Sequence, residues 1–372
     1  MEQLETMEYY ILQTQDILNS IYKNKEQTNK LAQVYMDGNY RNIKIIASGS
    51  SGNGSWCAKY VMEKYLGVDV TVINPYTFAY YPVLCEDDFV FVVSQSGYSK
   101  NALDALDILK KLNRKIIALT GDLKSDIKDH AEVVIDYVDE EKEGYVTKGV
   151  TTLALFLIKL TFAILEKQGK MVDTAWLDAY CESYASMQKE NFVHEEAFLE
   201  KFKKNFLSME NMYAAGCGPC EGVAKEAALK IGETVKVVSC AYELEEYIHG
   251  PNLQLSPKHN VFIIDAQDET SDRSYQIYRA SRAVSDRVYY ITNKAYDDHV
   301  LTLLNPCEDT VSLTYLQVFQ LFAYRISKEL RSIPKHPLFE NLKRSLIQKQ
   351  SHMKISVISL STCLEGFFFI DV

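Results

Sequence analysis

Three side chains with acid–base chemistry lie within twenty residues of one another in the sequence. Lys230 and Glu233 are three positions apart, so on a helix they share one face. His249 follows in the tetrapeptide Ile-His-Gly-Pro. Carboxylates and imidazoles are common general acids and bases in enzymes. Spacing alone, however, favours a surface ion pair for Lys230 and Glu233 and a structural role for the histidine.

Two cysteines offer a second kind of chemistry. Cys217-Gly-Pro-Cys220 has the C-x-x-C spacing of dithiol oxidoreductases, and it opens an alanine-rich helical segment. A zinc site is another alternative, because Cys217, Cys220, Cys240 and His249 supply four possible ligands. The third alternative is a plain turn made of small residues.

Two segments rich in small and hydroxyl-bearing residues could hold an anion. The segment 48–55, SGSSGNGS, supplies Gly49, Ser50 and Ser51. The segment 94–102, SQSGYSKNA, supplies Ser94, Gln95, Ser96 and Ser99. Small residues let a ligand approach the backbone, and free N–H groups at a helix start bind phosphate. Neither segment matches a P-loop or a dinucleotide fingerprint, so the pair favours a phosphate ester over ATP or NAD.

Alternating apolar runs and helical segments would position these residues. The predicted strands are 43–47, 69–75, 88–94, 115–122 and 131–137, and, after a long helical stretch, 211–216, 235–239, 260–266 and 287–293. Helices between successive strands, such as those at 55–66 and 101–113, indicate βαβ units and parallel sheets. Ligands of such sheets bind at the carboxyl ends of the strands, where both hydroxyl-rich segments fall.

The strand–helix pattern occurs twice with a nearly constant offset. Gly49 and Gly216 each precede a helix and are 167 residues apart, while Ser94 and Asp265 each end a strand and are 171 apart. Similar offsets at two points predict a tandem repeat of one α/β domain. The C-x-x-C segment then occupies the second copy of the 48–55 turn, which favours the plain turn over a redox pair or a zinc site.

Four parts make up the predicted domain organisation. An amphipathic helix is expected in residues 1–38, with Gly38 as its stop, and a first domain in 39–170. A second domain with preceding helices is expected in 171–350, and an atypical tail without helical period in 351–372.

Composition restricts the class of protein. The 372 residues are 47% hydrophobic and carry a net charge of −10, which argues against a nucleic-acid partner. The first ten residues hold three glutamates and no basic residue, so no signal peptide is expected, and no membrane span is expected either. The eight scattered cysteines are typical of a reduced, cytoplasmic protein.

In combination, these motifs resemble the SIS (sugar isomerase) family. The resemblance runs to about residue 345 and rests on GSS at 49–51, SQSGYS at 94–99, EGYVTKGVTT at 143–152, ALKIGET at 228–234 and YELEEYIHGP at 242–251. The chain is similar to tandem-SIS proteins such as the isomerase half of glucosamine-6-phosphate synthase and the fructosamine-6-phosphate deglycases. This implies an α/β fold of two tandem SIS domains, each a parallel sheet between helices in three layers.

Residue roles follow from the resemblance. Glu233 would move a proton between C1 and C2 of a 2-amino or 2-keto sugar phosphate, His249 would assist ring opening, and Lys230 would hold the open-chain form. The phosphate would be bound by Ser50, Ser51, Ser94, Gln95, Ser96 and Ser99. Further substrate contacts would come from Gly49, Thr147 and Lys148, and a C-terminal lysine would be Lys335 or Lys343. The neighbouring Glu243, Glu245 and Glu246 are interpreted as a solvated face.

The expected function is that of an enzyme acting on a phosphorylated ketosamine or amino sugar with C–N cleavage, as a deglycase or a deaminase/isomerase. Met1 is followed by Glu2 and not by a cysteine nucleophile, so amidotransfer from glutamine is not expected. The resemblance implies a cytoplasmic homodimer with composite active sites, without metal or cofactor and without a membrane partner. The alternative is a non-catalytic sugar-phosphate sensor.

Overall fold

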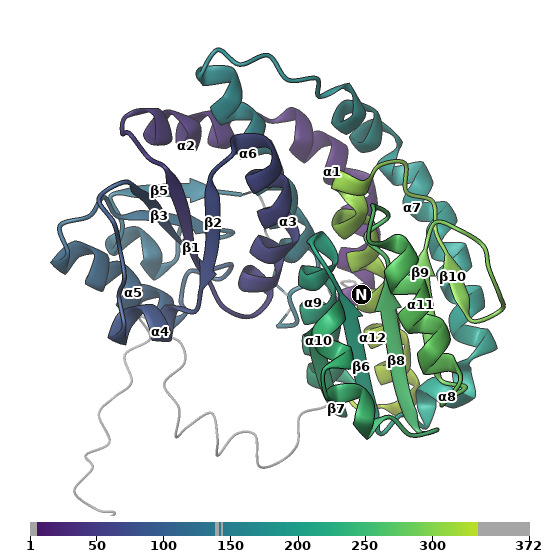
Figure 1. Ribbon diagram of the computed structural model, residues 1–372. Helices are drawn as coiled ribbons and strands as arrows, with labels where there is room; N and C mark the ends of the chain where they lie inside the picture. The colour runs from purple at the N-terminus through teal and green to yellow at the C-terminus, as the bar shows by residue number, and fades with distance from the viewer. Residues whose placement is uncertain (1–5, 138–140, 143, 334–372) are drawn as a thin grey trace, which may run out of the picture.

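Two α/β units lie side by side in the computed structural model, which describes residues 6–137, 141–142 and 144–333 (Figure 1). The first sheet consists of β1 (Asn42–Ile46), β2 (Asp69–Ile73), β3 (Asp88–Val93), β4 (Ile117–Thr120) and β5 (Val133–Asp136). The second consists of β6 (Asn211–Gly216), β7 (Val238–Glu243), β8 (His259–Ile264), β9 (Val288–Thr292) and β10 (Val300–Thr302). Every pairing between these strands is parallel.

Both sheets have the same strand order. The first runs β2-β1-β3-β4-β5, and the second, read from its other edge, runs β7-β6-β8-β9-β10. In each unit the second strand is thus at the edge and the first lies beside the third. This identity confirms the predicted fold class of two α/β repeats. It also places a topological switch point between β1 and β3, where open parallel sheets bind ligands.

Helices cover both faces of each sheet. In the first unit, α2 (Glu26–Met36), α3 (Gly49–Leu66) and α6 (Lys148–Lys167) share one buried cluster, while α4 (Pro75–Tyr80) and α5 (Lys100–Lys111) pack on the opposite face. In the second, α9 (Pro219–Thr234) and α12 (Val311–Leu330) oppose α10 (Leu244–Ile248) and α11 (Ser271–Arg282). Successive strand residues point to opposite faces, so Ile45 joins the first cluster and Ile46 the other.

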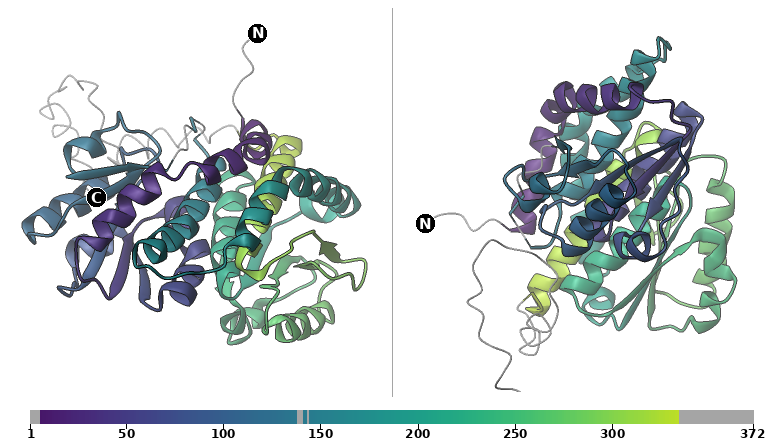
Figure 2. Two further views of the ribbon diagram at one scale, coloured as in Figure 1. Left: turned by 90° about the horizontal axis from the view of Figure 1, so that it is seen from above. Right: turned by 90° about the vertical axis from the view of Figure 1, so that its left-hand side faces the viewer.

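Three further helices complete the architecture. They are α1 (Met7–Lys23), α7 (Ala175–Lys201) and α8 (Lys203–Leu207). Short 3₁₀ turns lie elsewhere in the chain, at η1 (Asp126–Asp129), η2 (Pro251–Gln254) and η3 (Glu308–Thr310). Figure 2 shows α1, at the purple end of the chain, lying along helices of both units, and it contacts α6, α7 and α12. The N-terminal region therefore bridges the two repeats.

The long apolar helix α6 lies at the centre of the first unit. By length and composition it would be able to cross a membrane, but 89% of its most apolar window is buried inside the protein. Its Lys159 is also buried and donates to the carbonyls of Ile21 and Asn24, at the end of α1. In this fold α6 is a core helix that holds α1 in place.

Some predicted boundaries are wrong. The single helix expected in 1–38 is two helices, α1 and α2, because Asn24 adopts an extended conformation. The helix expected at 55–66 begins six residues earlier, at Gly49. The strand expected at 235–239 begins at Val238, because Lys236 has a positive φ of 67° that no strand accommodates. Lys335, Lys343 and the 351–372 tail lie outside the described residues.

The two units meet where α3 crosses α9. Both helices belong to one continuous buried cluster, and Gly222 of α9 lies against the backbone of α3. A Cβ at this position would lie 2.5 Å from the amide nitrogen of Cys57 and 2.9 Å from the carbonyl oxygen of Asn53. Only glycine allows this approach, so the crossing depends on it.

We predict that Gly222→Ala lowers the free energy of unfolding by about 1–3 kcal/mol, because the added methyl forces two backbones apart. Gly232→Ala in the same helix is the matched control. Its Cβ meets nothing closer than 4.0 Å, and alanine is the better helix former, so stability should stay equal or rise by about 0.5–1 kcal/mol. Urea unfolding of both variants measures this, and equal stabilities would contradict the close crossing.

Candidate functional site

A small polar cavity lies at the carboxyl ends of β1 and β3. Its volume is about 200 Å³. Its polar walls are Ser48, Ser50, Ser51, Ser94, Gln95, Ser96 and Ser99. The structure thus brings together all six residues predicted to bind phosphate, from two segments more than forty residues apart in the sequence.

Two helices begin at this cavity. Gly49, with a φ of +57°, starts α3, so Ser50 and Ser51 occupy its first turn and not a loop. Ser99 precedes α5, and its side chain makes no capping hydrogen bond. The first N–H groups of a helix lack partners within the helix and carry its positive dipole end. Two such ends beside one cavity favour an anionic ligand.

Ser94 is the most informative residue of the cavity. It is 4% exposed, and its hydroxyl finds no hydrogen-bond partner among the described residues. A buried hydroxyl left unpaired costs about 1–3 kcal/mol, so folding alone does not explain it. Its neighbour Gln95 donates from Nε2 to the carbonyl of Glu141, at 3.2 Å. An unpaired donor on an anchored loop is what a bound ligand would satisfy.

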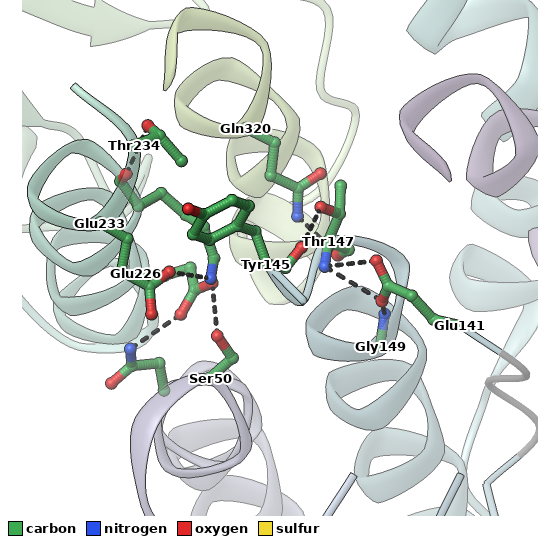
Figure 3. A network of polar contacts seen from close by, with 11 residues as sticks. Ser50, Glu141, Tyr145, Thr147, Gly149, Glu226, Glu233, Thr234 and Gln320 are labelled. Carbon is green, nitrogen blue, oxygen red and sulfur yellow. Dashed lines mark hydrogen bonds and ion pairs between the residues drawn. The ribbon is translucent and has the colours of Figure 1, made fainter. Parts of the chain in front are cut away.

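A chain of charged groups on α9 lies beside this cavity (Figure 3). The ammonium of Lys230 is 2.8 Å from a carboxylate oxygen of Glu233 and 3.5 Å from one of Glu226. Lys230 and Glu226 are each 1% exposed, whereas the Glu233 side chain is 35% exposed. The ion pair that spacing alone favours is therefore present, but its predicted location at the surface is wrong, because the lysine is fully buried.

Glu226 is the residue of this site that sequence reasoning missed. Its carboxylate accepts hydrogen bonds from the Ser50 hydroxyl, at 2.9 Å, and from the Asn53 amide, at 2.8 Å. The Ser50 hydroxyl proton is therefore directed at Glu226, and only the remaining groups of Ser50 face a ligand in the cavity. Its four-residue spacing from Lys230 is the signal that a helical-face search would have found.

Burial and charge set the protonation of this network. Burial raises the pKa of Glu226, and the Lys230 charge with the two hydrogen bonds offsets only part of that rise. Burial by itself would lower the pKa of Lys230, but the carboxylates of Glu226 and Glu233 outweigh it and hold this pKa above its usual value. Lys230 is thus a fixed cation between two carboxylates, one enclosed and one reaching solvent.

Glu233 faces a second, larger cavity between the two units. This cavity has a volume of about 610 Å³ and is walled by residues of α3, α9, β2 and β7, with Gly49 and Asn53 among them. Ser48 lines both cavities, so the two are neighbours that share a wall residue. A partly exposed carboxylate in the wall of a cavity can act as a general acid or base toward a ligand bound there.

Three predicted site residues line neither cavity. His249 is exposed at the end of α10 and lines neither cavity. Lys148 is buried, and its ammonium donates to Gln13 of α1 at 2.8 Å, so the expected substrate contact does not agree with its position. Thr147 is also buried, with its hydroxyl bonded to the carbonyl of Tyr145.

The loop before α6 is instead held by a buried carboxylate. Glu141 accepts hydrogen bonds from the backbone N–H groups of Thr147 and Gly149, at the start of α6. Gln320 of α12 donates to the Thr147 carbonyl from the other side (Figure 3). Gly144 and Val146 of this loop complete the wall of the small cavity. Thr147 therefore supports the cavity from behind.

In the second unit, a carboxylate lies at the strand end that corresponds to the small cavity. Asp265, the repeat counterpart of Ser94, is buried at the end of β8. It accepts hydrogen bonds from the hydroxyls of Ser271 and Thr292 and from the N–H of Gln267. These donors are thus satisfied by a carboxylate of the protein itself, whereas the Ser94 hydroxyl at the corresponding strand end has no partner among the described residues.

The C-x-x-C segment is a turn at the start of α9. Burial raises the pKa of both Cys217 and Cys220, which disfavours the thiolates that a redox pair needs. Among the described residues, only Cys85, Asp87 and Asp88 bring three metal-ligating atoms within 4.8 Å of one another, and they lie far from this turn in the sequence. The zinc alternative is therefore unsupported as well.

The nearby carboxylates of β7 and α10 have local partners. Glu243 accepts from the N–H groups of Glu245 and Glu246 and so caps α10. Glu245 forms an ion pair with Arg273 of α11. Their arrangement agrees with a structural surface and leaves Glu233 as the carboxylate of this group that faces the large cavity.

We predict that Lys230→Met destabilises the protein by about 3–5 kcal/mol near pH 8, because Glu226 would remain buried without its cation. Burial already raises the pKa of Glu226 above its value in the unfolded chain. Between these two pKa values the native state binds the extra proton, so stability falls as pH rises through that window. Without the Lys230 charge, the pKa of native Glu226 should rise further. The loss of stability in Lys230→Met relative to wild type should therefore be smaller at about pH 5 than at pH 8.

Urea unfolding at the two pH values measures this effect. Lys225→Met is the matched control, because this lysine of α9 is paired with Glu221 and is only half-buried. Its loss should cost about 1 kcal/mol or less, without that pH dependence. A Lys230→Met variant as stable as the control would contradict the buried ion pair.

Sequence relatives share part of their length with this chain. The isomerizing glutamine–fructose-6-phosphate aminotransferase of Caldanaerobacter subterraneus subsp. tengcongensis is 26% identical over 265 residues, which cover 70% of this chain and 42% of the relative. The enzyme of the same name from Clostridium tetani is 27% identical over 277 residues, 44% of its length. The chain thus spans less than half the length of these relatives.

Solved structures share the fold over nearly the whole chain. The C-terminal domain of glucosamine-fructose-6-phosphate aminotransferase from Francisella tularensis superposes with a TM-score of 0.79 at 19% identity, covering 90% of this chain and 99% of that one. The SIS domain family model matches residues 39–163, the region that holds β1 to β5 and the small cavity. The chain therefore contains an SIS domain and is homologous to the isomerase portion of the glucosamine–fructose-6-phosphate aminotransferases.

Proposed function

We propose that this protein is a phosphosugar-processing enzyme that transfers a proton between C1 and C2 of a phosphorylated ketosamine or amino sugar, with C–N cleavage. The observation that carries the proposal is that Glu233 lines the large cavity, which shares Ser48 with the hydroxyl-lined cavity of the first unit. A structural neighbour described as glucosamine-6-phosphate deaminase, from Thermotoga maritima, has a TM-score of 0.72 and 20% identity, and its described activity is of this class.

The phosphate would bind among Ser51, Ser94, Ser96 and Ser99 and the first N–H groups of α3 and α5. This fixes C6 of an open-chain hexose at one end and lets C1 and C2 reach Glu233 at the other. Holding the reacting carbons beside a base removes much of the entropic cost of the reaction. Lys230 holds the Glu233 carboxylate through its 2.8 Å contact and acts as a positioning residue.

For a ketosamine, the steps balance as follows. The Glu233 carboxylate takes a proton from C1 while the C2 oxygen gains one from water, which gives an enaminol. Glu233 then returns its proton to C2, which gives an iminium ion at C1. Water adds to the iminium carbon and releases a proton to solvent, and the C–N bond breaks to release an amine and an aldose 6-phosphate. An amino sugar phosphate would use the same proton transfer in the opposite sense, from C2 to C1.

His249 would assist ring opening from a second subunit. It is exposed and lines neither cavity of its own chain, which supports a composite site in a homodimer. The described cysteines are all unpaired thiols, in keeping with a cytoplasmic enzyme. Without turnover, the same phosphate cavity would instead serve the sensor function that the sequence left open.

We predict that Ser94→Ala weakens fructose 6-phosphate binding by about 1.5–3 kcal/mol, the contribution of a hydrogen bond to a charged group. Its stability should not fall, because the hydroxyl has no partner among the described residues. Ser55→Ala is the matched control: this buried hydroxyl donates to the Ser51 carbonyl and lines neither cavity. It should lose about 1 kcal/mol of stability and keep its affinity. Calorimetric titration and urea unfolding distinguish the two, and unchanged affinity in Ser94→Ala would contradict the phosphate site.

We predict that Glu233→Gln lowers kcat on a phosphorylated ketosamine about 10²–10⁴-fold while sugar-phosphate affinity stays close to wild type. Glutamine keeps the size of the side chain but cannot accept the proton. The exposed Glu246→Gln is the control and should keep full turnover. Mass spectrometry of the released amine measures both, and full activity in Glu233→Gln would refute the catalytic role. Wild-type binding without turnover on any ketosamine or amino sugar phosphate would favour the sensor.

Mixing tests the shared site. Inactive Glu233→Gln and His249→Ala chains, combined after dissociation, would form mixed dimers that carry one site with both residues intact. Partial recovery of turnover is expected. If the mixture stays inactive while each variant is shown to dimerise, His249 does not act across subunits.

A further inference from the structure

The large cavity beside Glu233 offers more room than an unsubstituted sugar phosphate needs. Its volume of about 610 Å³ is three times that of the phosphate cavity and falls within the range of about 300–1,000 Å³ typical of sites for drug-sized ligands. A ligand anchored in the small cavity and reacting at Glu233 would therefore leave most of the large one unfilled.

The wall beyond Glu233 is largely apolar. It is formed by Trp56 of α3, Val72 of β2, Ala228 and Leu229 of α9 and Ala241 of β7, all of them partly exposed. The ammonium of Lys225 lies 3.6 Å from the centre of the Trp56 ring and is paired with Glu221. Lys225 and Glu233 are the charged residues of this wall. Such a surface suits an apolar or aromatic group more than a second phosphate.

We propose that this cavity binds the nitrogen substituent of the substrate, and that the substrate is a ketosamine 6-phosphate carrying a bulky apolar or aromatic amine. The inference rests on the proposed function and adds the substrate class to it. The phosphate on C6 and the nitrogen on C1 are at opposite ends of an open-chain hexose. With the phosphate in the small cavity and C1 at Glu233, the substituent continues past Glu233 toward Trp56.

Substrates of graded size test the assignment. The probes are fructosamine 6-phosphates with N-methyl and N-benzyl substituents. An apolar group in a matching pocket is worth on the order of tenfold or more in kcat/KM, so the wild type should prefer N-benzyl by that factor. Trp56→Ala should abolish the preference, and Tyr81→Ala, which removes an exposed aromatic ring outside both cavities, should retain it. Equal kcat/KM for both substrates in the wild type would overturn the proposal.

Fluorescence gives a readout that does not depend on turnover. The chain has two tryptophans, so Trp176→Phe leaves Trp56 as the sole emitter. N-benzyl fructosamine 6-phosphate should shift or quench this emission, whereas fructose 6-phosphate should bind without doing so. Binding of both ligands with no change in emission would overturn the substituent site alone. Failure of fructose 6-phosphate to bind at all would instead refute the underlying phosphate site.

A second copy of the chain is the competing occupant of this cavity. If a partner subunit filled the space around Trp56, the N-benzyl compound would alter the emission of the Trp176→Phe variant only after dilution had dissociated the dimer, as measured by sedimentation. That outcome would overturn the proposal. A change in emission with the N-benzyl compound in the intact dimer would support it.

Discussion

One buried carboxylate links helix α9 of the second unit to helix α3 of the first. Glu226 of α9 accepts hydrogen bonds from Ser50 and Asn53 of α3 and is paired with Lys230 of its own helix. An ionised carboxylate in such a place is costly unless every partner is present, so the interaction tolerates little displacement. Because Ser50 lines the small cavity and Lys230 holds Glu233 in the wall of the large one, the same contact links the walls of the two cavities.

The two sheets have the same strand order, but they differ at the ends of β3 and β8 in what the nearby hydrogen-bond donors contact. In the first unit, the buried hydroxyl of Ser94 has no partner among the described residues. In the second, the Asp265 carboxylate occupies the corresponding strand end and is bonded by two hydroxyls and a backbone N–H. The two repeats thus differ at corresponding strand ends, and the second repeat supplies the helix that carries Glu226, Lys230 and Glu233.

The sequence predicts well what local pattern determines. Strand periodicity located both sheets but missed the three-residue strand β10, and the rule that ligands bind at strand ends predicted that Ser51 and Ser94 lie close together. Prediction from the sequence failed where contacts between distant segments determine the structure. The start of α3 at Gly49 depends on packing against α6 and α9, which overrides the poor helix propensity of its glycines. The burial of Lys230 and the orientation of Lys148 toward α1 likewise depend on partners that spacing along one helix does not reveal.

The glycine contact between α3 and α9 also determines how the cleft can move. Two backbones in contact cannot move closer together at the crossing, so a narrowing of the large cavity would require one unit to tilt on the other about Gly222. Glu233 stands eleven residues along α9 from that point, a lever arm of about 16 Å at the helical rise. A tilt of about 5° would then carry its carboxylate roughly 1.4 Å, which is the scale of displacement that separates productive from idle alignment.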